Sequence, residues 1–187
     1  MAEHHVCPVW VGYVLASPVR KLFQNPNKIL KPYVNEAMTV ADIGCAMGFF
    51  SLPLARMVGP NGKVICVDVQ EKMIRSLEKR TKKAGLSGRI KTIICDNDSP
   101  GLDDFKGKID FALAIGVVHE APDSARFFSE VYEAMKPAGR LLVAEGKSFV
   151  SETDFERTVS VAKSNGFEVT DRPKIKRGRT VLLQKKS

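Results

Sequence analysis

The sequence lacks a long apolar run. Hydrophobic residues make up 44% of its 187 residues, but no uninterrupted apolar stretch approaches the roughly 20 residues that a membrane-spanning helix needs. The N-terminus, Met1-Ala2-Glu3-His4-His5, has no basic region followed by an apolar one, which is the pattern of a secretory signal. We therefore expect no association with a membrane and a cytoplasmic location.

The sequence also lacks a cysteine framework. Its four cysteines, Cys7, Cys45, Cys66 and Cys95, are scattered along the chain, and thiols of this kind suit a reducing compartment. There is no internal repeat and no low-complexity linker. A chain of this length can bury a substantial core, and one main domain is the natural expectation.

What the chain does contain is a short apolar run that ends in an acid and is followed by small residues. Thr39 to Gly48 reads TVADIGCAMG, and an amphipathic segment follows from Phe49 to Val58. This order predicts a strand, a tight turn and a helix. Gly44 and Gly48 can adopt backbone angles that a side chain disfavours, and they let a ligand lie against the main chain. The N–H groups at the start of the helix point into the same space.

A second apolar run, KVICVD from Lys63 to Asp68, also ends in an acid. An acid at the tip of the second strand can accept hydrogen bonds from ribose hydroxyls. The two segments together predict a nucleoside site at the carboxyl ends of parallel strands. The dinucleotide fingerprint G-x-G-x-x-G is absent, because the chain has Gly44-x-Ala46-x-Gly48 with Asp42 two residues ahead.

On these residues the sequence resembles the class I S-adenosylmethionine-dependent methyltransferases, whose first motif is an acid followed by G-x-G-x-G. Asp42 to Gly48 matches that motif except at Ala46, where the turn has to form with a methyl group present. The resemblance runs from about Thr39 to the C-terminus and is of the small-molecule type, like the quinone-biosynthesis methyltransferases. It implies S-adenosyl-L-methionine as cofactor and a three-layer, Rossmann-like α/β fold. The sheet is then seven-stranded and mostly parallel, with an antiparallel last strand.

The hydrophobic pattern agrees with this fold, because predicted strands alternate with predicted helices, as in a mostly parallel sheet covered on both faces. The predicted strands begin at Thr39 and then span 63–68, 89–95, 110–115, 140–145, 166–170 and 179–183. The predicted helices span 49–58, 71–84, 122–135 and 152–164.

Residues 1–38 are expected to form an extension before the methyltransferase domain of residues 39–187. Ser17-Pro18 and Asn25-Pro26 each combine an N-cap residue with proline at the first helical position. The two short helices that they predict span about 18–24 and 26–35. The resemblance implies that this extension is a helical lid over the cofactor. The alternative is that the aromatic stretch around Trp10 simply packs on the domain.

The resemblance also implies a set of cofactor-binding residues at the ends of the first four strands. Asp96 follows the third strand, where the family contacts the adenine. Ile115 and Gly116 follow the fourth strand and offer main-chain contacts to the methionine part of the cofactor. The complete implied set is Asp42, Gly44, Cys45, Ala46, Gly48, Phe50, Asp68, Val69, Asp96, Asn97, Ile115 and Gly116.

The loop after the fourth strand, IGVVHEAP from Ile115 to Pro122, contains the candidate catalytic residues His119 and Glu120. Histidine has an unperturbed pKa near 6.5 and can act as a general base. The alternative is structural, with His119 bonded to the start of the helix at Pro122. Because the cofactor carries its own leaving group, the protein has to hold cofactor and acceptor in line, and a base is needed only where the acceptor loses a proton.

A metal site is a further interpretation. His4, His5 and Cys7 cluster near the N-terminus, and His119 and Glu120 could lie near them if the terminus folds back. The spacing matches no established zinc pattern, and such sites need tight geometry. We expect no metal.

The sequence leaves three classes of function: methylation of a small molecule, methylation of RNA or protein, and non-catalytic nucleoside binding. The net charge of +8 and the basic residues crowded after Asp171 permit an anionic partner. No aromatic residue is interleaved among these charges to stack a base. No Asn-Pro-Pro-Tyr-like tetrapeptide, the mark of many enzymes that methylate base amines, follows the fourth strand. We predict a small-molecule acceptor, with nucleic acid as the alternative, and a basic turn at the sheet edge, away from the chemistry.

Overall fold

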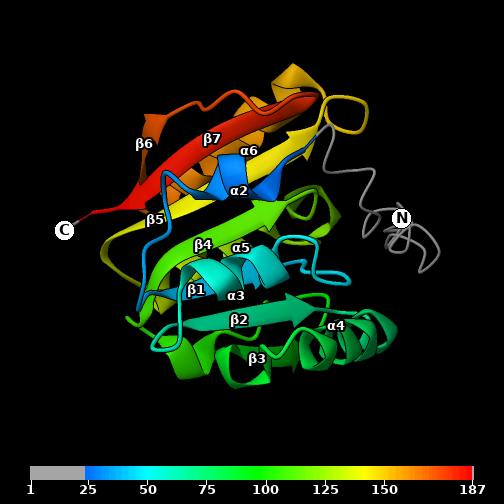
Figure 1. Cartoon of the computed structure of the whole chain (residues 1–187). Helices are drawn as coiled ribbons and strands as arrows, with labels where there is room; N and C mark the ends of the chain where they lie inside the picture. The colour runs from blue at the N-terminus through cyan, green and yellow to red at the C-terminus, as the bar shows by residue number, and fades with distance from the viewer. Residues whose placement is uncertain (1–23, 187) are drawn as a thin grey trace.

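The computed structural model describes residues 24–186. Within them, seven strands form one sheet in the order β3-β2-β1-β4-β5-β7-β6 (Figure 1). The strands are β1 (Thr39–Ile43), β2 (Lys63–Asp68), β3 (Ile90–Ile94), β4 (Ile109–Ile115), β5 (Met135–Gly146), β6 (Phe167–Asp171) and β7 (Gly178–Lys185). The α-helices are α2 (Pro26–Leu30), α3 (Ser51–Met57), α4 (Glu71–Lys83), α5 (Ser124–Ala134) and α6 (Glu152–Ser164). Short 3-10 turns are η2 (Ser87–Arg89), η3 (Asp103–Phe105) and η4 (Val118–Glu120).

Strand direction confirms the predicted Rossmann-like sheet. Strands β1 to β5 pair in parallel, whereas β7 is antiparallel to both β5 and β6. The reason lies in the connections, because β6 and β7 are joined by a turn without a helix, and such a turn can only reverse the chain.

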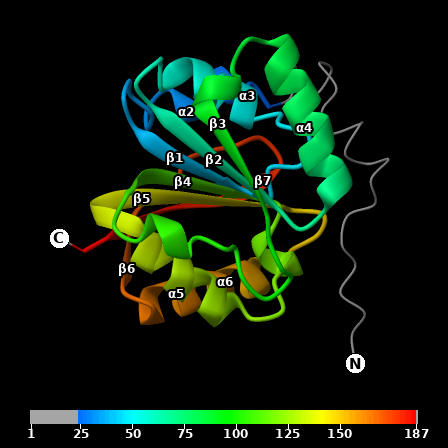
Figure 2. The same ribbon diagram turned by 90° about the horizontal axis from the view of Figure 1, so that it is seen from below.

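The central strands β1, β2 and β4 are buried on both faces of the sheet, which explains why they are apolar along most of their length. Successive side chains of a strand point to opposite faces. In β1, for example, Val40 belongs to the core beneath α2, α3 and α4, and its neighbour Ala41 belongs to the core beneath α5 and α6. Figure 2 shows these two helical layers on either side of the sheet.

The predicted helix 26–35 is shorter than expected. It begins as predicted at Pro26, after the N-cap Asn25, whose Oδ1 accepts a hydrogen bond from the Asn27 N–H at 3.0 Å, but it ends at Leu30. Beyond this point the chain turns onto the sheet, where the Tyr33 ring stacks on Phe111 with 5.6 Å between ring centroids. The other predicted helix of the extension, 18–24, lies outside the described residues except for Gln24, and Trp10 lies outside them as well. The lid over the cofactor therefore stays a prediction.

The boundary between α5 and β5 also differs from the prediction. α5 begins at Ser124 and not at Pro122, because Asp123 is the N-cap and its Oδ1 accepts the N–H groups of Ala125 and Arg126 at 2.9 and 3.0 Å. β5 begins earlier than the predicted Arg140, at Met135, with a register shift against β4 near its start.

The described helices are short. α4 and α6 have 13 residues each, and no helix between residues 24 and 186 combines the length and apolar character needed to cross a membrane. The cytoplasmic location stays a prediction.

Candidate active site

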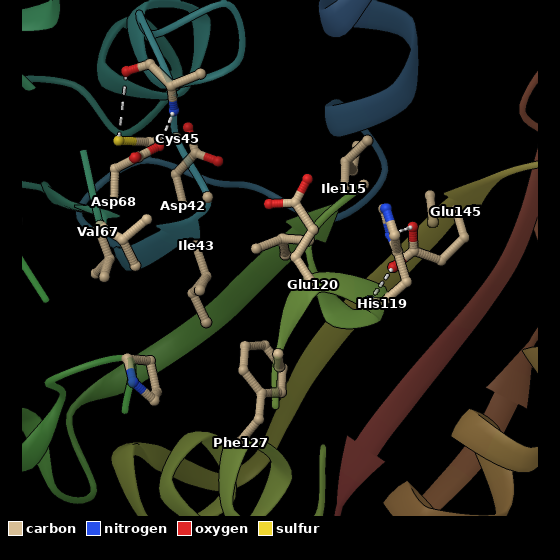
Figure 3. Close-up of a pocket in the computed structure, with 18 of the residues that line it drawn as sticks. Asp42, Ile43, Cys45, Val67, Asp68, Ile115, His119, Glu120, Phe127 and Glu145 are labelled. Atoms are coloured by element: carbon tan, nitrogen blue, oxygen red, sulfur yellow. Dashed lines mark hydrogen bonds and ion pairs between the residues drawn. The ribbon is translucent and has the colours of Figure 1, made fainter. Parts of the chain in front are cut away.

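The carboxyl ends of the parallel strands surround a cavity of about 890 Å³. The loops after β1 to β5 form most of its wall, and Gln24, Met73 of α4, Phe127 of α5 and the turn that leads into β7 contribute the rest. This position follows from topology, because parallel strands all end at the same edge of the sheet. Figure 3 shows side chains from several of these loops converging on the cavity. The predicted site residues that line it are Asp42, Gly44, Cys45, Ala46, Phe50, Asp68, Val69, Asp96, Asn97, Ile115, Gly116, His119 and Glu120.

Gly48, which was predicted to contact the cofactor, is not among the lining residues. Its φ is +83°, a conformation in which side chains are strained. A Cβ atom built on it would overlap with Cδ1 of Leu77 in α4. Gly48 is therefore needed for the close packing of α4 behind the glycine loop.

Asp68 fixes the shape of the glycine loop. Its side chain is buried, and Oδ2 accepts the N–H of Ala46 at 2.8 Å while Oδ1 accepts the N–H of Gln70 at 2.9 Å. Burial raises the pKa of the Asp68 carboxyl, and the two N–H groups oppose that rise. The turn therefore forms although Ala46 carries a methyl group and has a φ of +45°. The hydrogen bond from its N–H to Asp68 stabilises this conformation.

Two helices support the same loop from behind. The Ser51 hydroxyl at the start of α3 donates to Oδ2 of the buried Asp42 at 2.5 Å. The Arg80 guanidinium of α4 donates to the Met47 carbonyl, and burial lowers the pKa of this arginine. The loop is therefore held in place by side chains of the two helices behind it.

The thiols beside the loop are held in their neutral form. Cys45 is buried, and burial together with the neighbouring Cys66 raises the pKa of its thiol well above the usual value. Burial, and next the charge of Asp68, raises the pKa of Cys95 to about 11. A neutral thiol is a weak nucleophile, so these residues shape the wall and are poor candidates for covalent chemistry.

On the opposite side of the cavity, His119 forms a pair with Glu145, a residue that the sequence analysis did not select. The His119 Nδ1 lies 2.8 Å from Glu145 Oε2, and Glu145 Oε1 accepts the N–H groups of Val118 and His119 at 3.0 and 3.3 Å. The hydrogen bond to Glu145 raises the pKa of His119, and burial, which lowers this pKa, offsets part of the rise. The structural alternative predicted that His119 bonds to the helix start at Pro122. Its side chain instead bonds to Glu145 at the end of β5. The available clue was that β5, like β1 and β2, ends near an acid.

Phe149 and Glu120 complete this side of the site. Phe149 lies in the loop after β5, and its ring is close to parallel with His119, with an interplanar angle of 14° and 6.4 Å between centroids. Glu120 points into the cavity from η4, between Asp42 and His119 (Figure 3). Phe149 could not be identified from sequence, because a single aromatic residue in a loop has no pattern around it.

The basic turn between β6 and β7 does not lie where it was predicted. The register pairs Gly178 with Gly146 at the end of β5, so Arg177 and Gly178 line the cavity. An antiparallel strand begins where its parallel neighbours end, and this brings the turn to the site and leaves β6 at the sheet edge. Nearby basic side chains form ion pairs with α6, as Arg179 does with Glu152 at 3.4 Å.

No group of three or more histidine, cysteine or acidic side chains within residues 24–186 is arranged to hold a metal ion. His4, His5 and Cys7, on which the metal interpretation depended, lie outside the described residues.

Comparison with known proteins decides the family. Residues 34–177 match the model of a methyltransferase domain, which is most of the chain. The chain belongs to the class I S-adenosylmethionine-dependent methyltransferases. The family model confirms the predicted methyltransferase domain, and enzymes of this family use S-adenosyl-L-methionine, the cofactor that the sequence predicted.

Individual relatives of this methyltransferase are distant. The ubiquinone/menaquinone biosynthesis C-methyltransferase UbiE of Escherichia fergusonii is 28% identical over 113 residues, which are 60% of this chain and 44% of UbiE. The chain thus spans less than half the length of this relative. A methyltransferase structure from Aquifex aeolicus superposes with a TM-score of 0.84 at 23% identity, covering 96% of this chain and 98% of that one. An O-methyltransferase from Thermotoga maritima gives a TM-score of 0.67 at 21% identity, covering 87% and 65%. The two structures share the fold.

The cavity wall fits the cofactor of this methyltransferase family. Gly116 has a φ of +69°, and no atom lies within 4 Å of a Cβ built on it, so open space reaches the main chain there. Asp68 supplies a carboxylate to the same cavity, and carboxylates are suited to the hydroxyl groups of a ribose.

Proposed function

We propose that this methyltransferase transfers a methyl group to a small-molecule acceptor, which lies in the cavity between the glycine loop and His119. The observation that carries the proposal is the cavity itself. Its volume of about 890 Å³ lies within the range of small-molecule sites, roughly 300–1,000 Å³. A macromolecular acceptor would instead be expected to rest on an open surface.

We assign the cofactor to the side of the cavity that carries the glycine loop. Asp68 would bind the ribose, Asp96 and Asn97 the adenine, and the main chain at Ile115 and Gly116 the amino-acid part. When bound, S-adenosylmethionine supplies a methyl group on a sulfonium, so that transfer is a direct displacement on carbon. The protein contributes the alignment of the two reactants and the exclusion of water.

His119 is the proposed general base on the acceptor side, and Glu120 lies next to it. The names of UbiE and of the Thermotoga enzyme describe C- and O-methylation. Both reactions release a proton from the acceptor, so a base facing the acceptor is compatible with either. The likeness to UbiE, whose name places it in ubiquinone and menaquinone biosynthesis, supports a small acceptor and leaves the methylated atom to be identified.

RNA is a second candidate acceptor, favoured by the position of the basic turn at the cavity. A nucleic-acid backbone gripped by this turn would release counterions on binding, and its affinity would fall steeply with salt. The informative variant is Lys174→Gln combined with Lys176→Gln. Arg177 is left in place because it lines the cavity and would affect either acceptor.

The test is a screen of metabolite pools and RNA in parallel, with methyl-labelled cofactor and formation of S-adenosylhomocysteine as the readout. We expect turnover with a low-molecular-weight fraction, unchanged in the double lysine variant. Turnover with RNA alone, sensitive to salt and lost in that variant, would contradict the proposal.

A further inference from the structure

We propose that Glu145 is the positioning residue that makes His119 a proton acceptor, and that the Phe149 ring forms a shelf beside His119 for a planar acceptor with a phenol or enol hydroxyl. The inference rests on the proposed transfer to a small molecule and narrows its acceptor to one chemical class. Its basis is the pairing of η4 with the end of β5, which no local pattern in the sequence reveals.

The geometry selects one tautomer of His119. A carboxylate can only accept hydrogen bonds, so the 2.8 Å contact between Glu145 Oε2 and His119 Nδ1 puts the ring hydrogen on Nδ1. Nε2 of the neutral ring then carries the lone pair that takes up a proton. The Glu145 side chain is 1% exposed and is also held by the N–H groups of Val118 and His119, which keeps it from rotating away.

The charges around His119 favour its protonated form. Glu145 faces it from β5, Glu120 stands beside it on η4, and Arg177 lines the same cavity from the turn before β7. The two acids raise the pKa of the imidazole, the hydrogen bond to Glu145 being the largest cause. A ring in this environment holds the proton that it receives from an acceptor.

The proton transfer balances without any further reactant. The hydroxyl O–H bond of the acceptor breaks, its proton moves to Nε2 of His119, and the electron pair stays on the acceptor as a conjugated anion. With S-adenosylmethionine bound, that anion would attack the methyl carbon through oxygen or through a ring carbon, and the methyl–sulfur bond would break with its electron pair left on sulfur. After attack through carbon, the ketone formed would lose its ring proton to solvent and regain the hydroxyl form. One site design is therefore compatible with both C- and O-methylation. The imidazolium then returns its proton to solvent, to which the His119 side chain is 32% exposed.

Phe149 gives the acceptor side its flat surface. It is 81% exposed, although its ring lies close to parallel with His119. The loop sets the ring position, because the Phe149 N–H donates to the Gly146 carbonyl at 2.9 Å and a Cβ on Gly146 would lie 2.9 Å from the ring. A conjugated ligand stacked here would cover exposed apolar surface at the ring separations of aromatic pairs.

The first test measures the pair without any acceptor. The pKa of His119 is followed by NMR in the full chain, with its signal assigned by loss in His119→Asn. We expect a pKa above 6.5 that falls in Glu145→Gln and is unchanged in Glu168→Gln, a control on the exposed β6. An unchanged His119 pKa in Glu145→Gln would overturn the positioning role.

The second test compares acceptors and kinetics. Phenols and enols of low molecular weight are expected to be methylated, and aliphatic alcohols and amines of similar size are not. In Glu145→Gln, kcat should fall by about 100-fold, the lower end of what a general base contributes, with KM for S-adenosylmethionine unchanged. The increase of kcat with pH should occur at a lower pH in this variant than in the wild type, because the pKa of His119 is lower. Phe149→Leu should raise KM for the acceptor alone.

The outcomes separate the inference from the proposed function. Methylation of an aliphatic amine, or a Glu145→Gln variant with the kcat and pH profile of the wild type, would overturn the inference and leave small-molecule transfer intact. Methylation of RNA with no small molecule accepted would overturn both.

Discussion

Replacing Asp68 by alanine tests the binding site and the loop in one variant. The side chain is 8% exposed, and its loss leaves the N–H groups of Ala46 and Gln70 without their acceptors. Each unpaired buried donor costs about 1–3 kcal/mol. Both groups are only partly buried, so we expect the free energy of unfolding to fall by about 2–3 kcal/mol in total.

A loss of this size is measurable in both stability and binding. At about 2–4 °C per kcal/mol for a domain of this length, the melting temperature of Asp68→Ala should drop by about 4–12 °C. Loss of hydrogen bonds from ribose to a charged group should weaken binding of S-adenosylhomocysteine in calorimetry by at least about tenfold. Asp103→Ala, which removes an exposed acid from η3, is the matched control. A variant that melts with the wild type and binds with equal affinity would refute the reasoning.

Three further predictions follow from other parts of the structure. Gly48→Val forces a side chain against Leu77 at a φ of +83°, and should lower the melting temperature far more than Gly88→Val, where a Cβ meets open space; equal effects would contradict the packing role. Pairing with Glu145 raises the pKa of His119, so it stabilises the fold most below about pH 6.5, the unfolded value, and less as pH rises through the folded pKa. The stability difference between wild type and His119→Asn should therefore be larger near pH 5.5 than near pH 8.5, and the reverse order would contradict the pairing. The Cys95 thiol, with a pKa of about 11, is about one part in a thousand ionised near pH 8; mass spectrometry should show slow alkylation by iodoacetamide, and labelling as fast as that of free cysteine would contradict it.

The sequence predicts best what depends on neighbouring residues. β2 and α6 have the predicted ends, because an apolar run that ends in an acid and a helix cap are local patterns. The wall residues at the glycine loop and after β2 to β4 were also identified from sequence, since an acid or a glycine at the end of an apolar run marks a strand end in a parallel sheet.

What the sequence missed depends on contacts between distant segments. Glu145 meets His119 only because β4 and β5 are neighbours in the sheet. The two residues are 26 positions apart in the chain. Arg177 reaches the cavity because β7 inserts between β5 and β6 in reverse direction, whereas charge composition alone suggested a remote edge. The close approach of Gly48 to Leu77 of α4 is likewise a contact that the glycine motif does not reveal.

The central claim is that the cavity beside Asp68 and Gly116 binds S-adenosylmethionine. The most direct measurement is calorimetric titration of the full chain with S-adenosylmethionine, S-adenosylhomocysteine and NAD, each also tested for its effect on the melting temperature. We expect both S-adenosyl compounds to bind and to raise the melting temperature, as any ligand of the native state must, and NAD to do neither. Binding of NAD without binding of S-adenosylmethionine or S-adenosylhomocysteine would contradict the account.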